Sequence, residues 1–215
     1  MKLILCILFF LPIALIAQFG NQDFGTWSCV SVYKEVADDL KVEADFQVRT
    51  DDNSTRLNQF FLDLGAQYKV NKFFRTGISW RPRITNNWSG YKLGNRLYLD
   101  LTGKLKLNDI SLYLRSRTQT TSNRNAENPN YERIRFKAKF KIEKGLKAFV
   151  QDEFFFHLNG TGISNYKKNR FGLGFEYTIS DYLKMNLKYL RITEVNQVYP
   201  LRMNVIALGL SYSLE

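Results

Sequence analysis

The chain has 215 residues and a formal net charge of +11, with 31 Lys and Arg against 20 Asp and Glu. Aromatic residues make up 15% of the chain and Pro occurs only 4 times, which excludes an intrinsically disordered protein. The mean hydropathy of -0.30 excludes a bundle of transmembrane helices, and the presence of a single His, His157, argues against a His-based metal site.

The first element in chain order is a signal peptide over residues 1–17. Lys2 supplies the positive start, and Leu3 to Ala17 is an apolar run of about 15 residues, shorter than the roughly 20 that a membrane helix needs. Ala17 followed by Gln18 fits a cleavage site. We therefore expect an exported protein with one mature domain over residues 18–215, in which Cys29 has no intrachain disulfide partner.

The recurring pattern of the mature chain is period-two alternation of apolar and polar residues. Over residues 40–49, Leu, Val, Ala, Phe and Val alternate with Lys, Glu, Asp, Gln and Arg, which a strand separates onto two faces and a helix would scatter. A first strand is expected near residues 24–34. The alternation returns at residues 60–69, 74–81, 96–107, 110–117, 133–142, 170–179, 183–189 and 204–214. Residues 146–157 are less regular, and Asp152-Glu153 breaks their phase, which suggests a bulge.

The connections between these segments alternate between short and long. Tight turns are predicted at residues 71–72, 108–109, 143–145 and 180–181, and longer polar loops at residues 51–56, 85–94, 121–130, 158–168 and 194–201. Short periplasmic turns and long external loops are typical of outer-membrane barrels. The sequence therefore predicts an all-β fold, an antiparallel up-and-down transmembrane β-barrel of about 10–12 strands. Eleven strands can be counted, but bacterial barrels normally have an even number, so ten or twelve are expected.

Several motifs resemble a known family. They are Asp23-Phe24-Gly25-Thr26-Trp27, residues 63–68 (DLGAQY), residues 96–101 (RLYLDL), the basic strand near Arg133, and residues 208–212 (LGLSY). Together they resemble the bacterial domain of unknown function family 2490 over nearly the whole mature chain. The resemblance implies a small outer-membrane barrel and brings no activity, substrate or catalytic residue. The chain ends in Leu214-Glu215, where barrels of this type commonly end in an aromatic residue.

The candidate functional feature is a strongly basic polar face. On neighbouring predicted strands it comprises Arg115, Arg117, Arg133, Arg135, Lys137, Lys139 and Lys141. Five consecutive cations on the lipid side of one strand would cost about 2–4 kcal/mol each, so this face is expected to point into the lumen. The acids expected there are Glu43, Asp45, Asp63, Asp100, Glu153 and Glu176. Two interpretations remain open: a lumen held rigid by salt bridges, and a positive interior that binds anions.

Other candidate sites have plainer explanations. His157-Leu158-Asn159-Gly160 is similar to a segment of outer-membrane lipid hydrolases, but the nearest downstream Ser is Ser164. Asp152 and Glu153 are adjacent, so a strand would point them to opposite sides. Trp27, Trp80 and Trp88 are expected in an aromatic girdle at the membrane interface.

The expected function is that of a non-enzymatic barrel in the bacterial outer membrane, without a cofactor. It would be a narrow anion-favouring pore or a structural component of an envelope complex. The alternative is an outer-membrane enzyme that modifies lipid or lipopolysaccharide, and a soluble periplasmic β-protein is a third hypothesis. The expected partners are outer-membrane lipid and lipopolysaccharide, with a possible envelope protein complex and no nucleic acid.

Overall fold

A computed structural model describes residues 22–87, 90–123, 129–158, 165–196 and 200–215. The expected signal peptide, residues 1–17, lies outside the described residues. The described strands are β1 (Gln22–Ala37), β2 (Leu40–Asp51), β3 (Arg56–Lys69), β4 (Phe74–Asn87), β5 (Gly90–Leu107), β6 (Ile110–Asn123), β7 (Asn130–Glu143), β8 (Leu146–His157), β9 (Tyr166–Thr178), β10 (Leu183–Glu194) and β11 (Arg202–Leu214). No helix in the described ranges is long and apolar enough to cross a membrane.

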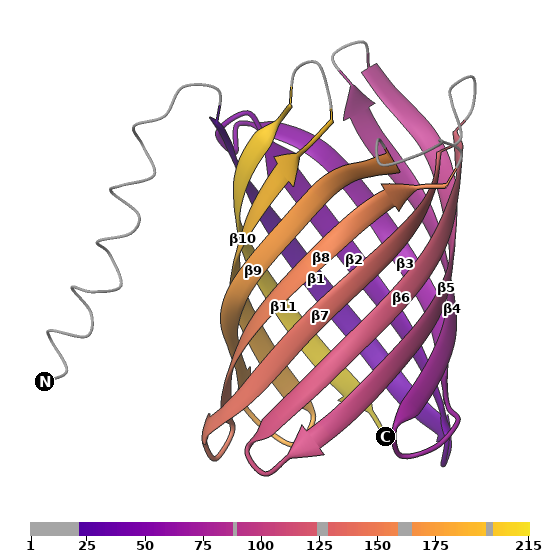
Figure 1. Ribbon diagram of the computed structural model, residues 1–215, viewed down its shortest axis with the longest axis vertical. Coiled ribbons are helices and arrows are strands. Elements are labelled where there is room, and N and C mark those ends of the chain that lie inside the picture. The colour runs from indigo at the N-terminus through magenta and orange to yellow at the C-terminus, as the bar shows by residue number, and fades with distance from the viewer. Residues whose placement is uncertain (1–21, 88–89, 124–128, 159–164, 197–199) are drawn as a thin grey trace, which may run out of the picture.

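The strands form a closed up-and-down barrel in which each strand pairs with its neighbours in the sequence (Figure 1). The barrel closes where β1 pairs with β11, and this pair is parallel, from Gln22 against Arg202 to Lys34 against Leu214. The predicted all-β barrel is confirmed. The preference for ten or twelve strands was wrong for the described residues, which form eleven. An odd number makes the first and last strands run in the same direction, so the closing pair must be parallel.

The two ends of the barrel differ in their connections. The tight turns lie at the end where the C-terminus also lies, and the turn between β2 and β3 lies at the opposite end (Figure 1). Asn108 and Gly145 have positive φ angles of 50° and 86°, which tight turns between strands require. One predicted loop was too long. Residues 85–94 are mostly strand, because β4 and β5 stay paired as far as Asn87 against Gly90.

Alternation gives the wall an apolar outer face and a polar inner face. Large apolar side chains point outward around the barrel and are 37 to 65% exposed, as at Phe46, Leu64, Ile78, Leu99, Phe136, Leu173 and Leu208. The predicted bulge at Asp152-Glu153 was misplaced. The phase of β8 is continuous there, and its register against β9 shifts between Phe155 and Phe156. Asp152 lies on the outer face because Gln151 and Glu153 both line the interior.

An apolar cluster fills the inner face beside the parallel closing pair. Its members are buried and come from β1, β10 and β11: Trp27, Leu190, Ile192, Met203, Val205 and Ala207. Val205 is 0% exposed and Ala207 is 1% exposed. We refer to this group as the seam cluster. It makes this side of the lumen a packed core, while the opposite side is lined by charge.

Candidate functional site: a basic lumen

The barrel encloses a cavity of about 490 Å³. Eleven basic side chains and six acidic side chains line it. The basic ones are Arg49, Arg75, Arg81, Arg96, Arg115, Arg117, Arg133, Arg135, Lys137, Arg170 and Lys188, and the acidic ones are Glu43, Asp45, Asp63, Asp100, Glu153 and Glu176. These six acids are the ones expected in the lumen from the sequence. Positive charge is therefore in clear excess around the cavity.

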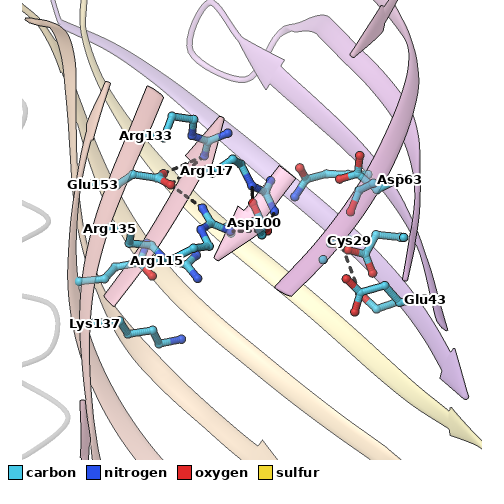
Figure 2. A pocket seen from close by; sticks show the side chains of 18 of the residues that line it. Cys29, Glu43, Asp63, Asp100, Arg115, Arg117, Arg133, Arg135, Lys137 and Glu153 are labelled. Atoms are coloured by element: carbon cyan, nitrogen blue, oxygen red, sulfur yellow. Dashed lines mark hydrogen bonds and ion pairs between the residues drawn. The ribbon is translucent and has the colours of Figure 1, made fainter. Parts of the chain in front are cut away.

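Glu153 is the centre of the largest ion cluster (Figure 2). Its side chain is 2% exposed and accepts from Arg115 at 2.6 Å and from Arg133 at 2.9 Å. A third arginine, Arg170, lies 3.4 Å from the carboxylate. The three cations come from β6, β7 and β9 and meet on β8. A single buried carboxylate thus holds together four consecutive strands.

Three smaller clusters continue this network along the wall. Arg117 and Arg115 share Asp100, at 2.5 and 3.9 Å, and Arg81 binds Asp63 through both carboxylate oxygens. Lys137 and Lys139 share Glu176, at 2.9 and 2.6 Å. In all of these clusters the partners stand on strands that are no more than two apart in the barrel. The ion pairs therefore follow the wall and do not bridge the lumen.

Five of the cavity-lining cations form no ion pair with a carboxylate in the described part of the chain. They are Arg49, Arg75, Arg96, Arg135 and Lys188. Arg96 donates to the Thr121 hydroxyl at 3.0 Å, and Arg49 donates to the Gln47 amide oxygen at 2.6 Å. Neutral acceptors of this kind orient a guanidinium without cancelling its charge. These five cations carry the excess positive charge of the lumen.

The residues of the predicted basic face do not all reach the cavity. Arg115, Arg117, Arg133, Arg135 and Lys137 line it, and Figure 2 shows their side chains gathered on one wall. Lys139 reaches the cavity only through its bond to Glu176. Lys141 is exposed close to the turn between β7 and β8, where it pairs in register with Lys147.

Aromatic side chains among the lumenal charges were not predicted from the sequence. Trp27, Phe61, Phe149 and Phe155 line the cavity, and Arg49 stacks on Trp27 at 3.7 Å and faces Phe61 at 4.8 Å from the ring centroids. The sequence did contain a signal for Phe61. It is two residues away from both Gln59 and Asp63, so a strand points all three side chains to the same face. Trp27 was wrongly expected in an interfacial girdle, since it is 7% exposed inside the barrel. Trp80 is on the outer face, and Trp88 lies outside the described residues.

Among the described residues, the remaining candidates do not assemble into a catalytic site. The ring of His157 contacts the ring of Tyr131, with centroids 5.2 Å apart, and Ser164 lies outside the described residues. Asp152 and Glu153 point to opposite faces of the wall. Within the ranges that the structure describes, no three His, Cys, Asp or Glu residues gather in a way that could hold a metal ion.

Comparisons with known proteins agree with this fold. The family model described as a protein of unknown function (DUF2490) matches residues 24–198, which confirms the resemblance noted in the sequence. No curated protein matches the chain. Among solved structures, the NanC porin in a rhombohedral crystal form is similar, with a TM-score of 0.56 and 13% sequence identity. The match covers 89% of this chain and 98% of the porin chain, and at this identity it shows a shared fold.

Proposed function

From the premise that the chain belongs to the DUF2490 family, whose description assigns no activity, we propose that it is a non-enzymatic outer-membrane barrel whose lumen is a narrow, anion-favouring pore. The observation that carries this proposal is the set of cavity-lining cations without a carboxylate partner. Charges enclosed by a protein wall are poorly screened, and an excess of one sign raises the local concentration of the opposite ion.

The arrangement of the ion pairs supports a pore over a purely structural barrel. A lumen plugged by salt bridges would have pairs that cross from one side to the other. Here each pair joins strands that are at most two apart, and a cavity of about 490 Å³ remains between the walls. The similarity to a porin supports the same proposal at the level of fold only.

The outer face supports a place in the outer membrane. Apolar side chains point outward on all eleven described strands, and an up-and-down barrel leaves no strand edge unpaired, which the interior of a bilayer requires. The partners proposed for this face are outer-membrane lipid and lipopolysaccharide. A role in an envelope complex would use the same face or the loops.

The test is the reversal potential of the purified barrel in a planar bilayer across a KCl gradient. We expect the wild-type barrel to favour chloride over potassium. Replacing two unpaired cations, Arg135→Gln with Lys188→Gln, should reduce this preference at least about threefold, because the lumen then loses roughly two positive charges. Reversing two paired cations, Lys137→Glu with Lys139→Glu, should move it further towards cations.

The matched control removes two positive charges outside the lumen, with Lys34→Gln and Lys72→Gln. It should leave the preference unchanged. A barrel that conducts with cation preference, or an anion preference that the lumenal variants do not move, would refute the pore proposal. Absence of any conductance would favour the structural component of an envelope complex instead.

A further inference from the structure

The outer face carries a carboxylate within its apolar surface. Asp152 has Val150 and Phe154 as its outward neighbours on β8, and Phe136 and Phe171 lie beside it in register on β7 and β9. The amide nitrogen of Asn169 donates to Asp152 at 2.5 Å. No cation of the described residues pairs with Asp152. Ionisable groups on a membrane-facing surface are costly, and they usually have a partner and a function.

An unpaired arginine stands on the same face two strands away. Arg191 on β10 is exposed, and because Leu190 and Ile192 are buried towards the lumen, its side chain points outward. In register, Arg191 lies beside Phe171. It too has no carboxylate partner among the described residues.

The two charges are therefore placed symmetrically about one aromatic residue. Asp152 and Arg191 flank Phe171 in a single row across β8, β9 and β10, each one strand away from it. Adjacent strands are about 4.8 Å apart, so the two backbones stand roughly 10 Å apart. An apolar groove of about 710 Å³ adjoins this row, lined by Phe136, Ala138, Val150, Asp152 and Phe171 among others.

We propose that this face is a two-fold interface between two copies of the chain. In a membrane, both copies must point the same way, so the two-fold axis runs parallel to the barrel axis. With the axis at Phe171, β8 of one copy faces β10 of the other. Because the strands are tilted (Figure 1), the row is inclined, and an inclination of about 40° over about 10 Å places Asp152 and Arg191 at heights that differ by roughly 6 Å. Asp152 of each copy then faces Arg191 of the other across this offset, which the long arginine side chain spans. The two Phe171 rings meet at the centre, as an isologous interface requires.

Charge complementarity favours a second copy of the chain as the molecule that covers the face around Phe171. A lipid headgroup amine would meet Asp152 but would leave Arg191 and the paired arrangement about Phe171 without a role. A different protein would need its own acid and base at the same spacing. The second copy supplies both groups at the required places. This inference is independent of the pore, because it uses only outward-facing residues.

The test is cysteine cross-linking in native outer membranes. In a Cys29→Ser background, Phe171→Cys places one thiol at the proposed axis, and oxidation should give a disulfide-linked dimer. The matched control is Leu62→Cys on β3, on the opposite side of the barrel. Leu62 and Phe171 are both 37% exposed and stand equally far from the turn ends of their strands. The control should give little dimer.

The charges are tested in the same cross-linking background. Asp152→Asn should lower the dimer yield at position 171 roughly fivefold, and the exchange Asp152→Arg with Arg191→Asp should restore it, because the exchange rebuilds both pairs. Equal yields at positions 171 and 62 would overturn the proposal. So would a yield at position 171 that is insensitive to Asp152→Asn, since the pair would then lie within one copy or bind another partner.

Discussion

The two sides of the lumen are built from opposite kinds of contact. Beside the parallel closing pair, the seam cluster packs Leu190, Val205 and Ala207 at 0 to 2% exposure. On the other side, β5 to β9 carry arginines and lysines arranged around Glu153, Asp100 and Glu176. An apolar cluster excludes water and fills the space between the strands, whereas a charged wall keeps water and ions near it. The comparison teaches that one side of the lumen packs the closing strands together, while the other side presents charge to the cavity.

The largest effect is expected at the centre of the charged wall. Glu153→Gln leaves Arg115, Arg133 and Arg170 facing one another without a carboxylate, which should cost about 3–5 kcal/mol in the free energy of unfolding. Equilibrium unfolding in urea, with the barrel in lipid vesicles, measures this. Glu43→Gln is the control, because its pair with Lys41 is partly exposed and should contribute less than about 1 kcal/mol. Equal losses in the two variants would show that the wall is not organised by Glu153.

A smaller loss is expected on the seam side. Leu190 is 2% exposed, so Leu190→Ala should destabilise the barrel by about 2–5 kcal/mol, towards the lower end because water from the lumen can fill part of the cavity. The control is Leu208→Ala, which removes an outward side chain that is 45% exposed. The same unfolding measurement applies, and the Leu208 variant should lose clearly less. If it loses as much, the seam cluster is not the packed core described above.

The smallest expected effect is a dependence on salt concentration, which should differ between the charged side and the apolar side of the lumen. The proposed anion preference acts through charge, so it should fall between about 0.1 M and 1 M KCl, as the Debye length drops from about 10 Å to about 3 Å. The loss of stability caused by Leu190→Ala should stay constant over the same range, because apolar packing is not screened. A preference that is independent of salt would mean that lumenal charge does not select the ion.

Strand alternation was enough to predict most of the barrel wall and its charges. Period two assigned Arg115, Arg133 and Asp100 to the lumen, because each side chain must point to one face or the other. Alternation does not predict which charged side chains form ion pairs with one another. Which arginines meet the Glu153 carboxylate depends on strand register across four strands, and no local pattern encodes that. Arg49 on β2, Arg170 on β9 and Lys188 on β10 were on the polar face in the sequence, yet only closure of the barrel brings them to the same cavity.

Two errors have a common physical origin. Trp27 was assigned to the membrane interface from its residue type, and Asp152 was assigned to a bulge from its polarity. In both cases the phase of the strand was the better guide. Trp27 follows the phase of Cys29 and Ser31 into the lumen, and Asp152 follows Val150 to the outer face. Composition describes the average environment of a residue type, whereas phase describes a position.

The parallel pairing of β1 with β11 has a consequence for how the barrel forms. All the remaining strand pairs join neighbours in the sequence, so these hairpins can form one after another through local contacts. The closing pair joins Gln22 to Arg202 and Lys34 to Leu214, near opposite ends of the chain. The intervening chain must lose conformational entropy before these contacts form. Closure should therefore be the last and slowest step of folding, and an open sheet with two free edges should be its direct precursor.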